Sequence, residues 1–218
     1  GGIFMIIPFL IFLLIITINL SSLKLFLLLL TIIGFFITGF LDDYLSIKKN
    51  ENTGLKTKEK FALQSIISLI FIFLAYEKNL INPLIMVSDS WGINMNIFIL
   101  PISFLVLVGI SNSVNLTDGL DGLAAGCSGI VFYGLGTEIL MKGQQELFVF
   151  SILCYSMCGI CLGFLKYNSH PAKIFMGDTG SLSIGAILGS IALLTNSLFT
   201  LSIFSGIFII ESLSVMIQ

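Results

Sequence analysis

Charged residues are scarce in this sequence. Asp, Glu, Lys and Arg make up 10% of the 218 residues, whereas hydrophobic residues make up 56%. Soluble domains carry about 25% charged residues, so the composition excludes a soluble globular protein. All ten basic residues are Lys and the net charge is only −2, which gives no support for nucleic acid as a partner.

Several sequence signals are also absent. No Gly-x-x-x-x-Gly-Lys-Ser/Thr or Gly-x-Gly-x-x-Gly string occurs, so a soluble nucleotide-binding fold has no support. Four cysteines do not make the dense pattern of a disulfide-rich secreted domain. The sequence begins at Gly1 without Met and stops within an apolar run at Gln218, so we expect one transmembrane domain, 1–218, truncated at both ends.

Long apolar runs account for most of the chain. A membrane-spanning helix needs about 20 predominantly apolar residues. The stretch Leu80–Asn96 lacks such a run and is predicted to be an external loop with a short hairpin. We predict an all-α polytopic helical membrane protein with about eight transmembrane helices, at Ile3–Leu20, Leu23–Leu41, Phe61–Tyr76, Ile97–Val114, Leu123–Met141, Leu147–Leu165, Leu182–Asn196 and Leu198–Gln218.

The Lys residues divide unequally between the two sides of such a bundle. If the loops alternate, seven Lys residues fall on one side and three on the other, and cytoplasmic loops carry the excess. We therefore predict that the loops at 42–60, 115–122 and 166–180 share the cytoplasmic face. The same face receives five aspartates: Asp42, Asp43, Asp118, Asp121 and Asp178.

The acidic clusters contain the residue types of a metal–phosphate site. Adjacent carboxylates at Asp42 and Asp43 repel each other and attract a divalent cation, and nearby Lys side chains can hold phosphate. Asp178 lies near a predicted helix N-terminus, whose exposed amides favour a phosphate group. Phe175, three residues earlier, can stack on a base.

Simpler roles stay open for single members of these clusters. An isolated Asp often caps a helix, and a Lys-rich stretch can anchor the chain on anionic lipid. His170 precedes a proline, and a structural or capping role suits it at least as well as ligand contact. An ion-coupled transporter would also bury carboxylates, but near the midplane of broken helices rather than at loop ends.

Three strings resemble one enzyme family. They are Phe-Leu-Asp-Asp-Tyr at 40–44, Asn-Ser-Val-Asn-Leu-Thr-Asp-Gly-Leu-Asp-Gly-Leu-Ala at 112–124, and His-Pro-Ala-Lys-Ile-Phe-Met-Gly-Asp-Thr-Gly-Ser-Leu at 170–182. In sequence and order they are similar to the phospho-N-acetylmuramoyl-pentapeptide-transferase family, within the polyprenyl-phosphate N-acetylhexosamine-1-phosphate transferase superfamily. The resemblance covers essentially the whole chain.

This resemblance implies a multi-pass enzyme of the bacterial inner membrane with its active site on the cytoplasmic face. The implied reaction transfers phospho-MurNAc-pentapeptide from UDP-MurNAc-pentapeptide to undecaprenyl phosphate, giving lipid I and UMP in peptidoglycan synthesis. The lipid bilayer is a further partner, and a homodimer is left open. The alternative is a sister transferase that uses UDP-N-acetylglucosamine. The family's first and last spans are absent here, and such a fragment need not be active by itself.

The resemblance also implies roles for individual residues, with Mg²⁺ as the cofactor. The catalytic residues would be Asp42, Asp43 and Asp178. The metal ligands would come from Asp43, Asn115 and Asp178. Substrate binding is predicted for a wider set in and around the three loops: Lys58, Lys60, Asn112, Asp118, Asp121, Asn168, His170 and Phe175.

Overall fold

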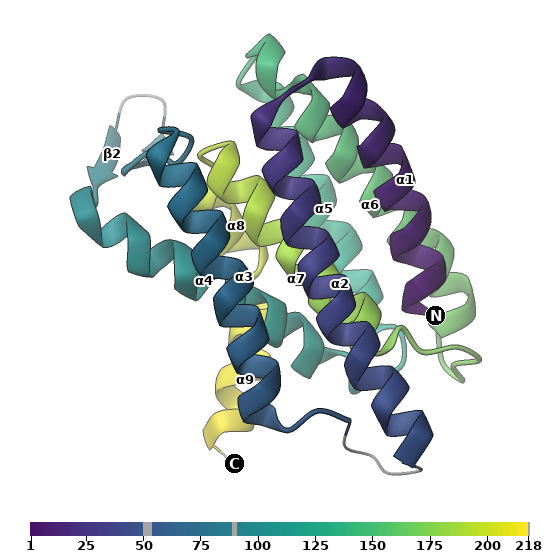
Figure 1. Ribbon diagram of the computed structural model, residues 1–218. Coiled ribbons are helices and arrows are strands. Elements are labelled where there is room, and N and C mark those ends of the chain that lie inside the picture. Colours follow the sequence, from purple (N-terminus) through teal and green to yellow (C-terminus); the bar gives the residue numbers. More distant parts are fainter. Residues whose placement is uncertain (50–53, 89–90, 218) are drawn as a thin grey trace.

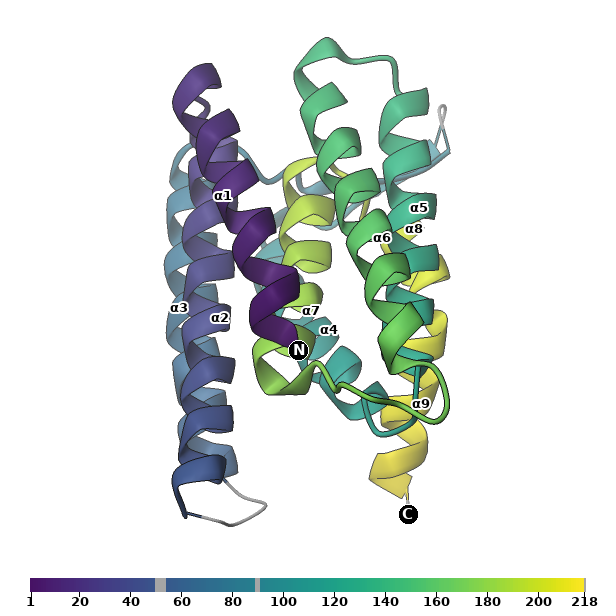
Figure 2. The same cartoon turned by 90° about the vertical axis from the view of Figure 1, so that its right-hand side faces the viewer.

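Apolar helices packed side by side form most of the structure (Figures 1 and 2). A computed structural model describes residues 1–49, 54–88 and 91–217. The elements within these residues are α1 (Gly2–Leu20), α2 (Leu23–Lys49), α3 (Thr57–Glu77), β1 (Leu84–Ser88), β2 (Trp91–Asn94), the 3₁₀ helix η1 (Asn96–Phe98), α4 (Ile99–Thr117), α5 (Leu123–Met141), the 3₁₀ helix η2 (Gln145–Leu147), α6 (Phe148–Asn168), α7 (Gly177–Leu194), α8 (Leu198–Phe204) and α9 (Gly206–Ile217).

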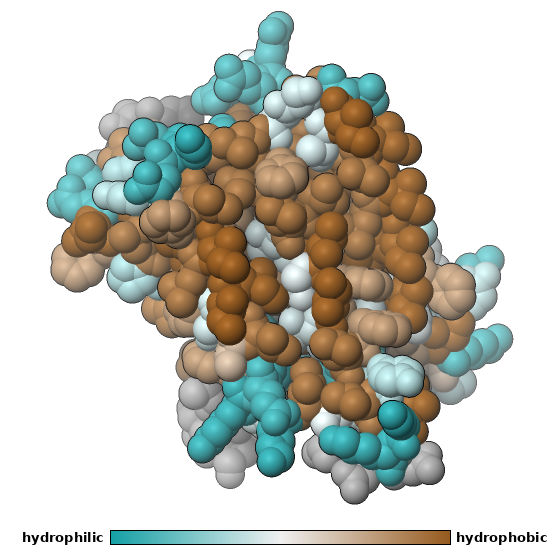
Figure 3. All heavy atoms as spheres, viewed as in Figure 1, coloured by the Kyte–Doolittle hydropathy of each residue, from teal (hydrophilic) through white to brown (hydrophobic). Residues whose placement is uncertain are grey.

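Within the described ranges, seven helices are long and apolar enough to cross a membrane, and they are α1 to α7. Figure 3 shows the corresponding surface, with a broad apolar band between two ends where polar side chains gather. Helices suit the bilayer because each satisfies its own backbone hydrogen bonds. The prediction of a polytopic helical fold is confirmed, and the chain is a multi-pass membrane protein.

The last predicted span, Leu198–Gln218, is not one continuous helix. Its described part forms α8 and α9, of 7 and 12 residues, with Ser205 between them. A membrane crossing needs about 20 residues, so neither helix is long enough. The break falls where Gly206, a poor helix former, follows Ser205. The predicted eighth span is therefore wrong over the described residues, and Gln218 lies outside them.

Helix α2 is longer than its apolar run. The predicted span ends at Leu41, but the helix continues to Lys49. Its last turn carries Lys48 and Lys49, whose positive charges complement the negative end of the helix dipole. Asp42 and Asp43 therefore lie on a rigid helix rather than in a loop, and successive residues on a helix point about 100° apart.

Helix α7 occupies the centre of the bundle, between α2 and α4 (Figure 1). Its span is 89% buried, and small residues let its neighbours approach closely. A Cβ atom added at Gly39 of α2 would lie 2.3 Å from the carbonyl oxygen of Asp178. A Cβ added at Gly185 of α7 would lie 2.3 Å from Cα of Ser111 in α4. The first turn of α7 is thus held directly against α2.

The predicted hairpin within Leu80–Asn96 is confirmed. Strands β1 and β2 pair antiparallel, with Leu84 opposite Asn94 and Ile85 opposite Ile93. The hairpin lies at the end of the bundle away from the last residues of α2 (Figure 1).

Candidate active site

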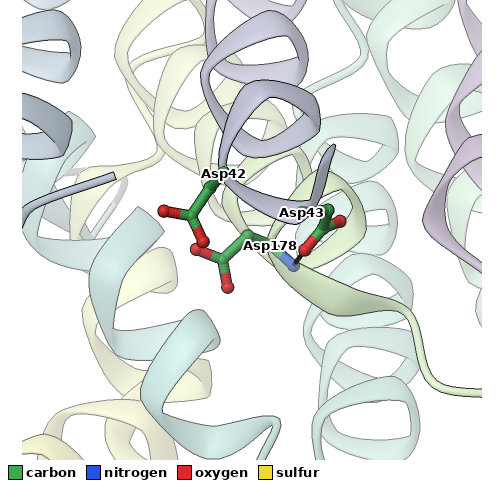
Figure 4. A group of neighbouring side chains, drawn as sticks. All are labelled: Asp42, Asp43 and Asp178. Carbon is green, nitrogen blue, oxygen red and sulfur yellow. Dashed lines mark hydrogen bonds between the residues drawn. The ribbon is translucent and has the colours of Figure 1, made fainter. Parts of the chain in front are cut away.

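Three aspartates from α2 and α7 meet at one end of the bundle. Asp42, Asp43 and Asp178 each offer a carboxylate oxygen, and these oxygens lie within 4.8 Å of one another. Figure 4 shows the Asp42 and Asp178 side chains facing each other, whereas Asp43 turns toward the backbone of α7. The fold thus brings Asp178 beside Asp42 and Asp43, which precede it by more than 130 positions in the sequence.

Asp43 caps helix α7 from a neighbouring helix. Its Oδ1 accepts the N–H of Asp178 at 3.0 Å, and its Oδ2 accepts the N–H and the hydroxyl of Thr179. Helix α7 needs such a partner because its own N-cap residue is Met176, which makes no side-chain cap. Gly177, at φ 64°, leaves room for the carboxylate, since a Cβ there would lie 2.7 Å from Asp43 Oδ2.

The Lys60 ammonium lies between the other two carboxylates. Its Nζ is 3.3 Å from Asp42 Oδ1 and is also paired with Asp178 Oδ2. Asp42 Oδ1 additionally accepts the N–H of Leu55 at 2.9 Å. These side chains are at most 20% exposed, so water screens the charges less than at an open surface. Lys60 therefore offsets part of the negative charge of the cluster.

Asn115 holds the second oxygen of Asp178. Its Nδ2 donates to Asp178 Oδ1 at 2.7 Å and to Ser181 Oγ at 2.9 Å. Asn115 thus faces Asp178 with its amide nitrogen, which orients the carboxylate. Its predicted role as a direct metal ligand stays a prediction.

Asn112 pairs with a residue that the sequence did not single out. Its Nδ2 donates to Gln64 Oε1 at 2.7 Å and to the carbonyl oxygen of Val108 at 2.7 Å. Gln64 lies in the largely apolar span of α3 and is fully buried. The sequence signal that could have pointed to Gln64 is its position four residues after Lys60, because residues with this spacing share a helix face.

Asp121 ties two of the acidic loops together. Its Oδ2 accepts the N–H of Ala172 at 3.0 Å and lies 3.0 Å from Nδ1 of His170. The N–H of Ala172, followed by His170, holds the pKa of Asp121 below its ordinary value. The ring of His170 is otherwise open to solvent. Substrate binding by these two residues stays a prediction.

Asn168 bridges the same two loops from a buried position. Its Oδ1 accepts the N–H of Gly122 at 3.1 Å, and its Nδ2 donates to the carbonyl oxygen of Ile174 at 3.0 Å. Both polar atoms of the side chain are thus used to shape the loops. Its predicted contact with substrate is untested.

Three further predicted residues differ in their surroundings. Burial raises the pKa of Asp118 to about 7, and the charges of Asp178 and Asp43 act in the same direction. A carboxyl group with this pKa can exchange a proton near neutral pH.

Phe175 is 58% exposed, so its ring is accessible for stacking. Lys58, in the first turn of α3, is exposed to solvent.

The donor set at the cluster suits a hard divalent cation. Mg²⁺ prefers oxygen ligands and is often held by one or two carboxylates, with water in its other positions. Asp42 and Asp178 face each other and could hold it with the oxygens that pair with Lys60 in this structure, and the ammonium would then move aside (Figure 4). The oxygens of Asp43 already accept three hydrogen bonds from α7.

The chain is similar to proteins from several Prochlorococcus marinus strains that share one name. A family model described as "Glycosyl transferase family 4" matches residues 25–196. The chain is 90% identical over all 218 residues to proteins named "Phospho-N-acetylmuramoyl-pentapeptide-transferase" from Prochlorococcus marinus strains MIT 9301 and MIT 9312. It is 63% identical to the protein of that name from Prochlorococcus marinus subsp. pastoris. Each match covers 61% of the relative, so the chain spans about three fifths of these relatives' length.

Proposed function

This chain belongs to glycosyl transferase family 4, and we propose that the full-length protein is a phospho-N-acetylmuramoyl-pentapeptide-transferase. Its substrates are UDP-MurNAc-pentapeptide and undecaprenyl phosphate, and its products are lipid I and UMP. The 90% identity to proteins of that name supports this assignment. The structural observation that carries it is the cluster of Asp42, Asp178 and Lys60 at one end of a membrane-spanning bundle.

The chemistry requires alignment and charge neutralisation rather than a protein nucleophile. An oxygen of the lipid phosphate forms a bond to the sugar-linked phosphorus, and the bond from that phosphorus to the UMP oxygen breaks. Lys60 supplies a positive charge beside the reacting phosphates, and Asp42 orients Lys60. Asp178 and Asp42 would hold Mg²⁺, which would neutralise charge on the diphosphate.

The position of the cluster suits a lipid substrate. The polar end of the bundle borders the apolar band of Figure 3, so a polyprenyl tail can stay in the bilayer while its phosphate reaches the aspartates. Lys48 and Lys49 end α2, and Lys58 and Lys60 lie in the first turn of α3, which supports a cytoplasmic active site in the bacterial inner membrane. A homodimer stays a prediction.

The assignment can be tested by supplying full-length protein with two nucleotide sugars. UMP release is measured with undecaprenyl phosphate and either UDP-MurNAc-pentapeptide or UDP-N-acetylglucosamine, with and without Mg²⁺. We expect release only from UDP-MurNAc-pentapeptide and only with the metal. Exclusive use of UDP-N-acetylglucosamine would instead assign the protein to the sister transferases.

A further inference from the structure

A pair of amide side chains lies one helical turn deeper in the bundle than the acidic cluster. Gln64 of α3 is fully buried. It receives a hydrogen bond from Asn112 Nδ2 at 2.7 Å and returns one from Nε2 to Asn112 Oδ1 at 3.4 Å. The carbonyl oxygen of Val108 fixes the other side of the Asn112 amide. Because a buried amide is costly unless it is hydrogen-bonded, α3 and α4 are joined specifically at this point.

The same two helices carry the residues that hold Asp178. Lys60 lies four residues before Gln64, and Asn115 lies three residues after Asn112, so each shares a helix face with its amide neighbour. Lys60 pairs with Asp178 Oδ2, and Asn115 donates to Asp178 Oδ1 at 2.7 Å. One oxygen of Asp178 is therefore held from α3 and the other from α4.

We propose that Gln64 and Asn112 are a positioning pair, which sets the orientation of the Asp178 carboxylate through Lys60 and Asn115. This differs from the substrate contact predicted for Asn112, because the amide is used within the bundle. The inference rests on the proposed phosphoryl transfer, in which a displacement of about 1 Å far from the reacting atoms can cost about 100-fold in rate.

The alternative is that the pair only fills space between α3 and α4. Two apolar side chains of similar shape would then serve as well, because replacing both partners of a buried hydrogen bond is often nearly neutral for stability. Removing one partner alone leaves an unsatisfied amide and destabilises the bundle in either case. The double replacement therefore separates positioning from packing.

The test uses the full-length enzyme with Gln64→Met, Asn112→Leu and the double variant. Ser68→Ala is the matched control, because Ser68 is buried one turn further along α3 and its hydroxyl has no hydrogen-bond partner among the described residues. Three quantities are measured: thermal stability, kcat and KM for UDP-MurNAc-pentapeptide, and binding of Mn²⁺ by electron paramagnetic resonance as a probe of the metal site.

We expect each single variant to lose thermal stability and the double variant to regain it. The double variant should keep a kcat about 10- to 100-fold below wild type, with a nearly unchanged KM and weaker Mn²⁺ binding. Ser68→Ala should match wild type in all three measurements.

Recovery of turnover and Mn²⁺ binding together with stability in the double variant would overturn the inference. A failure of the proposed function is seen separately, because wild-type protein would then release no UMP from UDP-MurNAc-pentapeptide. In that event the Mn²⁺ measurements alone decide whether the amide pair positions Asp178.

Discussion

Replacing Asp43 with Ala should loosen the first turn of α7 even when no metal is present. The side chain accepts two backbone N–H groups and one hydroxyl from Asp178 and Thr179. If Asp43 served chiefly as a metal ligand, its removal would have no effect on the helix in a chelating buffer. The two roles therefore make opposite predictions for the same variant.

The size of the effect follows from these contacts. Loss of an N-cap side chain costs about 0.5–2 kcal/mol. Loss of a carboxylate at a helix N-terminus costs about 0.3–1 kcal/mol, and up to about 2 kcal/mol where the site is partly buried. Because Asp43 accepts two backbone N–H groups and a hydroxyl, the upper half of each ordinary range applies, and together these predict that Asp43→Ala favours opening of the first turn by about 2–3 kcal/mol. Since each 1.4 kcal/mol is tenfold, the opening equilibrium shifts by about 30- to 150-fold.

Amide hydrogen exchange measures this opening directly. The full-length protein is compared with Asp43→Ala in the presence of a chelator, and the peptide that contains Asp178 and Thr179 is followed. We expect exchange in this peptide to accelerate by about 30- to 150-fold. Thr179→Val removes only the hydroxyl bond and keeps both N–H bonds, so it should show a much smaller change.

Two results would refute the capping role. The first is an exchange rate in the α7 peptide that Asp43→Ala leaves unchanged without metal. The second is an equal acceleration in the peptides of α5 and α6, which would indicate general destabilisation rather than a local cap.

The remaining predictions concern the other groups around the cluster. Phe175→Ala should raise KM for the UDP-sugar more than it lowers kcat, because the exposed ring is placed for stacking rather than chemistry; steady-state kinetics measure both. Lys60→Met should lower kcat at least tenfold, since it leaves Asp42 and Asp178 without the ammonium between them; the same assay with Lys78→Met, in the turn after α3, is the control. In a chelator, the pKa of Asp118 is about 7 in the folded protein and 3.8 in the unfolded chain. Between these two pH values the folded protein therefore binds a proton on Asp118 and the unfolded chain does not. The contribution of this group to stability therefore falls as pH rises through that window, and Asp118→Asn should remove that fall in thermal unfolding curves.

The sequence was sufficient to predict the membrane bundle and the meeting of the acidic segments. Apolar runs of spanning length are a strong signal, and the alternation of loops placed Asp43, Asn115 and Asp178 on one side. The hydrogen bonds of Asp43 and Asn115 to α7 agree with that grouping. Hydropathy did not show that α2 continues past Leu41, because charged residues lower the score in a helix as they do in a loop.

Pairwise roles were harder to predict. Asp43 and Asp42 are adjacent and chemically identical in the sequence, yet one caps α7 and the other meets Lys60. This division depends on which way each side chain leaves the helix and on the close approach of α2 to α7. Gln64 was missed because one amide in a largely apolar segment hardly changes the mean hydropathy of that segment. Its partner, Asn112, is also 48 positions away in the sequence.

Asp178→Asn in the full-length enzyme tests most directly whether Asp178 holds the metal that assists phosphoryl transfer. UMP release from UDP-MurNAc-pentapeptide is measured for both proteins over a range of Mg²⁺ concentrations, together with binding of the nucleotide sugar. We expect a loss of turnover far larger than the loss of nucleotide affinity. Near-normal turnover with an unchanged Mg²⁺ dependence in Asp178→Asn would contradict it.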